Sequence, residues 1–160
     1  MLSFALAWLS STSRDDTHHW IGLIAAALIA FGLVWGFIGS PYARFAQFVR
    51  KPKSTLNYLI AILRGTEARY IGHNPAGAMM VLALLTSVAA TAATGWLMTT
   101  DMYFGDDAMQ EFHSFCADAT VVLIILHICG VFLASYRHRE NLIGAMLNGN
   151  KRSAIDTDVG

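Results

Sequence analysis

The stretch from residue 113 to residue 136, HSFCADATVVLIILHICGVFLASY, decides the fold. It is mostly apolar, begins with His113 and carries His127 fourteen residues later. Fourteen residues make almost four turns of α-helix, so both imidazoles project from nearly the same face, about 21 Å apart along the axis. A bilayer core is about 30 Å thick, so one spanning helix would place a histidine near each leaflet. Because ionisable side chains inside a membrane usually mark function, this pair predicts a functional site.

The composition is that of a membrane protein. Of the 160 residues, 55% are hydrophobic and 14% are charged, whereas soluble domains carry about 25% charged residues. Cys116 and Cys129 fall on the same predicted helix about 20 Å apart, too far for a disulfide bond, and we interpret them as packing residues. The absence of a Cys-x-x-Cys-His motif excludes a covalently attached c-type haem.

Three stretches meet the requirement of about 20 mostly apolar residues for a membrane span. They are residues 20–38, 76–98 and 109–136. Residues 87–95, within the second stretch, are rich in small side chains, which is typical of a closely packed helix face.

The distribution of positive charge predicts the orientation, because lysine and arginine concentrate on the cytoplasmic side. The loop of residues 40–74 and the C-terminal tail hold every lysine and arginine except Arg14. The connection of residues 99–110 has no positive charge and carries Asp101, Asp106 and Asp107. We therefore expect the 40–74 loop and the C-terminus in the cytoplasm, and the acidic connection outside.

Residues 2–9 (LSFALAWL) are apolar but too short to span. They look like the outer half of a spanning helix whose inner half is missing, so we expect that the chain begins late. The final residues, 153–160, are expected to be a disordered tail.

The 40–74 loop predicts a short amphipathic helix on the cytoplasmic membrane surface, with Ser54 as its N-cap. Apolar residues recur there at helical spacing: Leu56, Leu59, Ile60 and Leu63. Its basic residues are expected to meet anionic lipid headgroups. Because the basic cluster is small and next to the membrane, we expect no nucleic-acid binding.

Helix direction decides which histidines can meet. The helices that start near His18 and near His113 both run inward, so His18 or His19 can reach the level of His113 at the outer side. Gly22 would leave space for a flat macrocycle. A haem held by two histidines between these helices fits this arrangement, and it leaves no open iron position, which suits electron transfer.

A second, inner haem is expected at His127, where Gly130 would let the macrocycle approach and Thr120 would lie between the two haems. Its other ligand is expected from the missing half of the N-terminal helix, and His73 is the one substitute in this chain. For His19 and His73 taken singly, an ordinary structural role is the simpler interpretation. An external metal site is an alternative for one short run: Asp15, Asp16, His18 and His19.

Several motifs resemble the bacterial cytochrome b561 family, which includes the cytochrome b subunits of membrane-bound nickel-iron hydrogenases. The motifs are residues 72–78 (GHNPAGA), 94–96 (TGW), 35–40 (WGFIGS), 42–45 (YARF) and 135–142 (SYRHRENL), together with His113 and His127. Together these motifs cover nearly all of the sequence from His18 to Arg152.

The resemblance implies an all-α membrane protein, a four-helix transmembrane bundle that holds b haem between its helices. Here three spans would be complete and the first helix truncated. The resemblance assigns His18, rather than His19, with His113 to the outer haem, and His127 to the inner one. The family's partner for His127 comes from the first helix, which this chain lacks. The inner haem could therefore bind through His127 alone, recruit His73 or be missing.

The expected function is that of a cytochrome subunit rather than a stand-alone enzyme, in one domain of residues 1–152. It would carry electrons between an outside partner, such as a hydrogenase-like enzyme, and quinone in the bacterial inner membrane. A homodimer is left open. One alternative is an enzyme that oxidises superoxide or another small molecule and reduces quinone. Such an enzyme would need a cationic path to the outer haem, and Arg14 is the one arginine or lysine expected on the outer side. Another is a haem-free transporter or assembly protein, which an absorption spectrum would distinguish.

Overall fold

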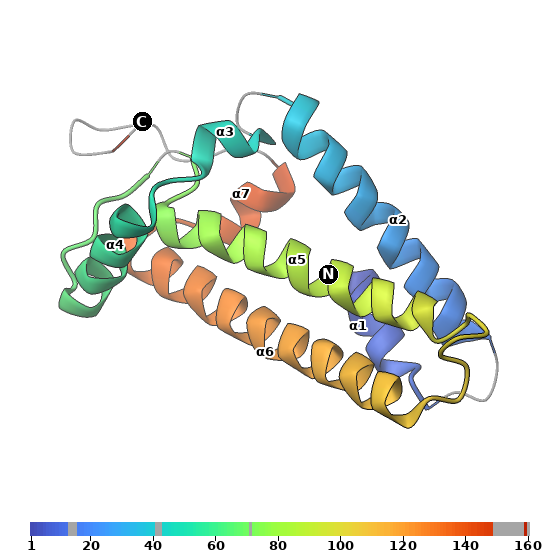
Figure 1. The fold of residues 1–160 in the computed structure, drawn as a ribbon. Helices are drawn as coiled ribbons and strands as arrows, with labels where there is room; N and C mark the ends of the chain where they lie inside the picture. The colour runs from blue at the N-terminus through green and yellow to red at the C-terminus, as the bar shows by residue number, and fades with distance from the viewer. Residues whose placement is uncertain (13–15, 41–42, 71, 149–158, 160) are drawn as a thin grey trace. The chain divides into compact units, whose positions relative to one another are not determined.

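The computed structural model describes residues 1–12, 16–40, 43–70, 72–148 and 159. Within these residues the chain is all α-helical, as the sequence predicts, apart from an isolated bridge between Tyr70 and Val159. The helices are α1 (Leu2–Leu9), α2 (Thr17–Ile38), α3 (Phe45–Phe48), α4 (Pro52–Arg64), α5 (Pro75–Leu97), α6 (Asp107–His138) and α7 (Leu142–Asn148) (Figure 1). The expected disordered tail lies outside the described residues, except for Val159.

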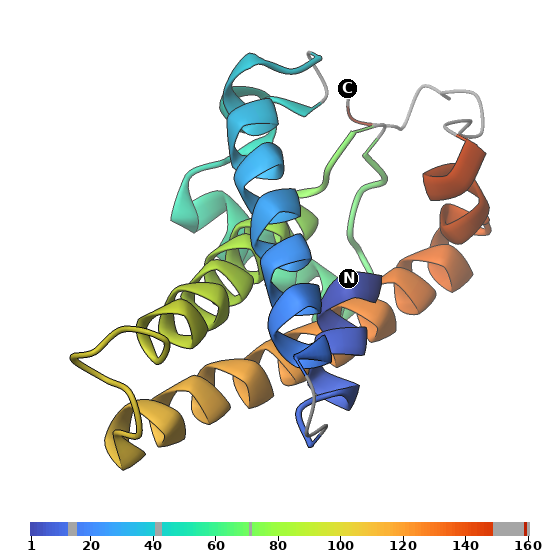
Figure 2. The ribbon, with the colours of Figure 1, turned by 90° about the vertical axis from the view of Figure 1, so that its right-hand side faces the viewer.

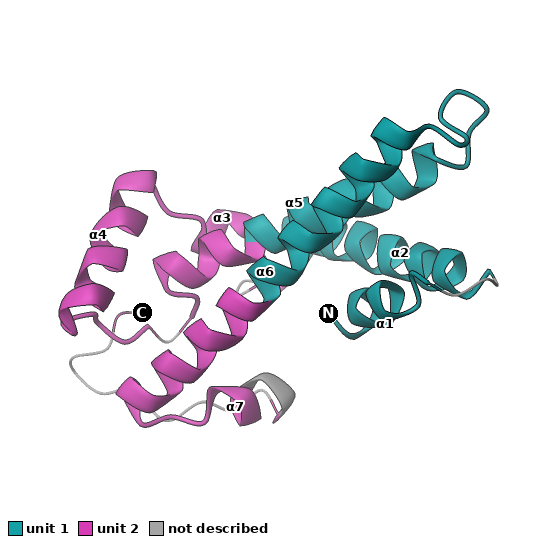
Figure 3. Cartoon of the chain, turned by 90° about the horizontal axis from the view of Figure 1, so that it is seen from below, with its two compact units in different colours: residues 1–39, 82–124 teal, residues 40–81, 125–160 magenta. Residues whose placement is uncertain are grey.

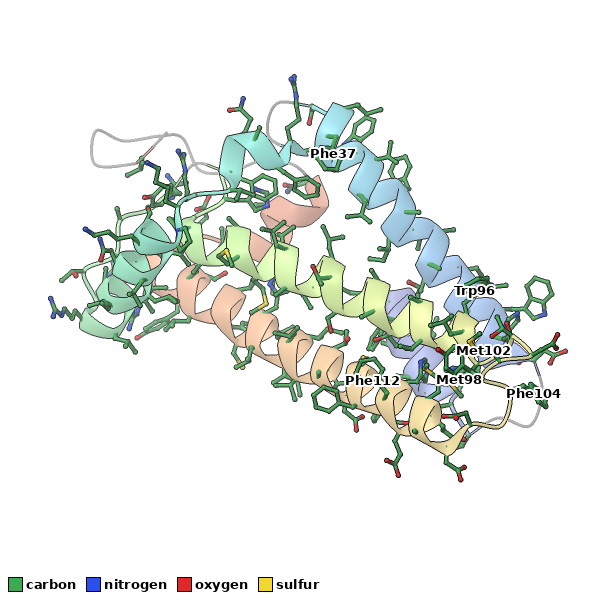
Figure 4. The ribbon with its side chains drawn as sticks, in the orientation of Figure 1. Phe37, Trp96, Met98, Met102, Phe104 and Phe112 are labelled. Carbon is green, nitrogen blue, oxygen red and sulfur yellow. The ribbon has the colours of Figure 1, made fainter. Side chains whose placement is uncertain are left out.

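The three predicted spans are confirmed as helices. Among the described residues, α2, α5 and α6 are the helices long and apolar enough to cross a membrane. Large apolar side chains on them are exposed, among them Phe37 and Phe112, and the α5–α6 connection exposes Met102 and Phe104 (Figure 4). Such a surface suits lipid and the membrane interface rather than water.

Side-chain caps define where three helices begin. In each case an Asn or Asp side-chain oxygen accepts a hydrogen bond from the backbone amide three residues later, which satisfies one of the free amides of the first turn. The pairs are Asn74 with Gly77 (2.6 Å), Asp106 with Met109 (2.7 Å) and Asn141 with Gly144 (2.8 Å). The first two pairs set the starts of α5 and α6.

The amphipathic helix is present as α4, but Ser54 is not its N-cap. The helix begins at Pro52, and Lys51 takes the cap position. The ring of Pro52 presets a helical φ at the first position, so the helix starts three residues earlier than a cap at Ser54 indicates. Gly65 ends it with φ +68, a left-handed conformation that glycine adopts easily.

One face of α4 is buried and the other is exposed. Thr55 and Tyr58 are buried, whereas the apolar residues that predicted the helix are open, with Leu63 86% exposed and Leu56 58% exposed. The exposed apolar face therefore remains available for lipid.

The chain forms two compact units, coloured separately in Figure 3. Unit 1 consists of Met1–Gly39 and Leu82–Ile124, and unit 2 of Ser40–Val81 and Ile125–Gly160. In unit 1, α1 lies beside the first turns of α2 (Figure 2). The indole nitrogen of Trp8 on α1 also donates to Asp118 Oδ1 on α6 at 3.5 Å. Unit 1 thus brings together α1, α2 and parts of α5 and α6.

Ion pairs hold unit 2 together. The Arg69 guanidinium donates twice to the Glu140 carboxylate, at 2.9 Å each, and both side chains are buried. Arg137 binds Glu67 at 2.8 Å and also donates to the Ile62 carbonyl. These contacts connect the segment between α4 and α5 to the C-terminal end of α6.

Tyr58 anchors the buried face of α4. Its hydroxyl donates to the Ala68 carbonyl at 3.2 Å. Burial, with smaller contributions from the charges of Glu67 and Tyr70, raises the pKa of the Tyr58 phenol to about 12. The hydroxyl therefore stays a hydrogen-bond donor throughout the physiological pH range.

Candidate functional site

His18 and His113 lie together in unit 1. Their ring centres are 6.2 Å apart and their ring planes are almost perpendicular, at 89°. His18 stands in the first turn of α2 and His113 in the second turn of α6, and both are half-buried. Helix direction predicts that His18 or His19 reaches the level of His113, and the family resemblance selects His18. The structure brings the His18 ring to the His113 ring.

The His18 ring is oriented by the backbone of α1. Its Nδ1 lies 2.8 Å from the carbonyl oxygen of Ala7. A carbonyl oxygen only accepts hydrogen bonds, so Nδ1 carries the proton. In a neutral imidazole the lone pair is then on Nε2. The α1 segment, too short to span, thus supplies an orienting contact that the sequence does not reveal.

The His113 ring is oriented by α5. Its Nδ1 lies 3.0 Å from the hydroxyl oxygen of Thr94. The neighbouring Gly95 lies so close that a Cβ added there would be 3.0 Å from His113 Cε1. The close-packing face predicted for residues 87–95 therefore has a specific use here, because it lets an imidazole lie against the α5 backbone.

The spacing of the two imidazoles fits a metal ion between them. Bonds from a metal ion to an imidazole nitrogen are about 2 Å long, so two rings on opposite sides of one ion have centres about 6 Å apart. Among the described residues, no three His, Cys, Asp or Glu side chains are grouped to hold a bare ion. Haem needs only two axial protein ligands, because the macrocycle supplies the other four nitrogens. Two imidazoles are therefore the number of protein ligands that haem iron needs.

His19 does not join this pair, and His73 belongs to the other unit. His19 is exposed, and its ring centre lies 6.0 Å from that of Trp20. His73 is in unit 2, where its ring centre lies 4.7 Å from that of Phe48. The external metal site includes Asp15, which lies outside the described residues.

His127 is half-buried on the part of α6 that belongs to unit 2. Space is open beside Gly130, one turn further along α6, and beside Gly22 on α2, because a Cβ added at either glycine would meet nothing within 4 Å. These openings are compatible with the predicted approach of a macrocycle. The cofactor-binding roles of His127 and of the two glycines stay predictions.

Thr120 is fully buried between α5 and α6. Its hydroxyl is hydrogen-bonded to the Ser87 hydroxyl and to the Cys116 carbonyl, and it lies 3.4 Å from the Thr91 hydroxyl. The contact packs α6 onto the small-residue face of α5 within unit 1. A role for Thr120 beside a haem stays a prediction.

Cys116 and Cys129 are both free, as expected from their spacing.

Two contacts of the histidine pair were missed by reasoning from the sequence. The Ala7 carbonyl gives no sequence signal, because it belongs to the backbone. Thr94 gives a weak one, since it is a polar residue inside an apolar span next to a glycine. Only the pairing of α5 with α6 shows that its hydroxyl meets His113.

The family model described as prokaryotic cytochrome b561 matches residues 1–149. The chain belongs to the prokaryotic cytochrome b561 family. It is thus a membrane b-type cytochrome that takes part in electron transfer, and the family implies haem b as its cofactor. No curated protein and no solved structure matches the chain. The expected family membership is confirmed, and with it the general class of function.

Proposed function

We propose that His18 and His113 would hold haem b, and that the chain would pass electrons between a partner outside the membrane and quinone. The observation that carries this proposal is the pair of imidazoles, with ring centres 6.2 Å apart and each Nδ1 in a hydrogen bond. Each ring then has its lone pair on Nε2, the atom that would bind iron.

The two histidines determine which chemistry the site favours. Haem bound there would supply a one-electron couple between ferric and ferrous iron. Two imidazole ligands leave no open iron position, so the site favours electron transfer over oxygen binding. His18 and His113 are both half-buried, and the Ala7 carbonyl and the Thr94 hydroxyl hold the rings in place.

A second haem is proposed at His127. The half-buried imidazole and the open space beside Gly130 support it. His73 is the substitute for the second ligand that the described residues offer. Its ring packs near Phe48, so it would have to move or to bind haem from that position. The proposal therefore includes two haems, one at His18 and His113 and one at His127.

The proposed architecture is a four-helix bundle in one domain of residues 1–152, with α1 as part of the first helix. The contacts of α1 with α2 and with Asp118 of α6 support a place for it beside two of the spans. The bundle would lie in the bacterial inner membrane.

The proposed orientation places the 40–74 loop and the C-terminus in the cytoplasm. The charge distribution supports it, with the acidic α5–α6 connection on the opposite side. In this orientation α4 rests on the cytoplasmic surface with its exposed leucines in the lipid interface and Lys51, Lys53 and Arg64 near headgroups. The outside partner would be a hydrogenase-like or other electron-transfer protein.

The test is the haem content of the purified protein and of histidine variants, measured from the absorption spectrum. Wild-type protein should show the sharp reduced α-band of haem with two histidine ligands. His18→Ala and His113→Ala should each lose the same haem, and His127→Ala should lose a different one.

His19→Ala and His138→Ala are the matched controls, because each removes a histidine that is assigned to no haem. Both should keep the wild-type ratio of haem to protein. Unchanged haem content in His18→Ala and His113→Ala would overturn the ligand assignment. A wild-type protein without the band, made with haem available, would favour the transporter or assembly interpretation.

A further inference from the structure

Thr94 is a buried polar residue in the last turn of the predicted membrane span α5, and only 5% of it is exposed. Its hydroxyl oxygen lies 2.9 Å from the Ala90 carbonyl, 3.0 Å from the Thr91 carbonyl and 3.0 Å from His113 Nδ1. A single side chain thus connects the backbone of α5 to the imidazole on α6. Helix packing alone would not require a hydroxyl at this position.

The number of protons available fixes the direction of these hydrogen bonds. A threonine hydroxyl has one hydrogen to donate and two lone pairs with which to accept. The carbonyls of Ala90 and Thr91 only accept, so the hydroxyl hydrogen points to them. The Thr94 oxygen can then only accept from His113, which means that Nδ1 carries the proton. The lone pair of the neutral ring is consequently on Nε2.

The same stretch of α5 also fixes the position of the ring. Gly95 allows the backbone to approach so closely that an added Cβ would come within 3.0 Å of His113 Cε1. The ring is therefore held by a hydrogen bond that it donates to Thr94 and by contact with Gly95. Partners of this kind orient metal-binding histidines and increase their basicity.

We propose that Thr94 is a positioning residue for haem binding: by accepting a hydrogen bond from His113 Nδ1, it presents Nε2 to the iron of the outer haem. This inference rests on the proposed function, and it adds the residue that selects the tautomer of a ligand. Thr94 acts through His113 and does not itself touch the cofactor.

The experiment compares the full-length Thr94→Val, Thr94→Ser and Thr91→Val variants in a His127→Ala background, so that only the outer haem is followed. Valine has nearly the shape of threonine without the hydroxyl, and serine restores the hydroxyl. Thr91 is the matched control, because it lies one turn away in the same α5–α6 contact and its hydroxyl binds the Ser87 carbonyl. The readouts are the rate of haem transfer to excess apomyoglobin and the midpoint reduction potential.

Thr94→Val should lose haem about tenfold faster than its parent, within the range typical for partners of metal ligands. Its potential should shift in the positive direction, because a less basic imidazole stabilises ferric iron less. Thr94→Ser and Thr91→Val should both stay within about twofold of the parent rate. If Thr94→Val does not accumulate in the membrane, Thr94→Ala replaces it with the same expected result.

Equal effects of Thr94→Val and Thr91→Val would assign the change to α5–α6 packing and overturn the proposal. So would a Thr94→Val variant that keeps the parent rate and potential while the parent binds haem, and that result would leave the proposed function intact. A wild-type protein that binds no haem at all would overturn both.

Discussion

Arg69 and Glu140 are joined by two hydrogen bonds of 2.9 Å, although 71 positions separate them in the sequence. Each side chain is 6% exposed. Arg69 belongs to the segment that precedes α5, and Glu140 lies between α6 and α7. Because a guanidinium and a carboxylate fit each other at two points, this pair fixes both direction and distance within unit 2.

Replacement of Arg69 by alanine should destabilise the protein strongly. The change removes the guanidinium from a buried ion pair, and breaking such a pair typically costs about 3–5 kcal/mol. Thermal unfolding in detergent measures the effect. Arg64→Ala, which removes an exposed arginine of α4, is the control and should change the unfolding midpoint little. An Arg69→Ala variant as stable as Arg64→Ala would show that the pair contributes little to stability.

Replacement of Gly95 by alanine should lower haem binding. The new methyl group would lie 3.0 Å from His113 Cε1, so the ring would have to shift. Gly32→Ala is the control, because its methyl group would make ordinary contact, at 3.7 Å, with the Leu85 side chain. In a helix, alanine by itself stabilises by roughly 0.5–1 kcal/mol relative to glycine. Haem per protein should therefore fall in Gly95→Ala alone, and an equal ratio in both variants would count against a close fit at His113.

The contact between Glu67 and Arg137 should make stability depend on pH. Burial on its own raises the pKa of the Glu67 carboxyl, but the hydrogen bond from Arg137 and the charges of Arg137 and His138 outweigh it, so the pKa lies below its ordinary value of 4.5. The stabilisation is therefore complete above pH 4.5 and is lost as the pH falls below that value.

Glu67→Gln tests this dependence, because the amide keeps the shape but not the charge. Above pH 4.5 the variant should unfold at a lower temperature than wild type. The difference between the two midpoints should shrink as the pH falls below 4.5. Unfolding midpoints of both proteins across this range give the measurement. A difference that stays constant with pH would mean that ionisation of Glu67 does not stabilise unit 2.

The exposed apolar face of α4 should be protected by lipid. In a Cys116→Ala, Cys129→Ala background, Leu63→Cys should react slowly with a charged, membrane-impermeant maleimide in membranes open to the reagent. Asn57→Cys, on the exposed polar side of α4, should react faster. Detergent should bring the two rates closer together. Equal rates in the intact membrane would place α4 away from the lipid surface.

The sequence by itself determined the membrane class, the three spans and the family. These follow from local properties: apolar runs of about 20 residues form helices wherever the solvent is lipid, since no other partner satisfies their backbone groups. Helix direction also predicts that His18 or His19 comes near His113, because it places all three near one surface, and the family resemblance selects His18. Ser54 misled the prediction of a cap, since the preset φ of Pro52 begins α4 earlier.

Only the tertiary structure decided how the two rings are held. The Ala7 carbonyl and the Thr94 hydroxyl reach the imidazoles from helices distant in sequence, and backbone atoms carry no sequence signal. The same holds for Arg69 and Glu140, two charged residues among many, whose pairing depends on where α5 begins and α6 ends. Helices follow from neighbouring residues along the chain, whereas ligand orientation depends on atoms that packing brings within about 3 Å.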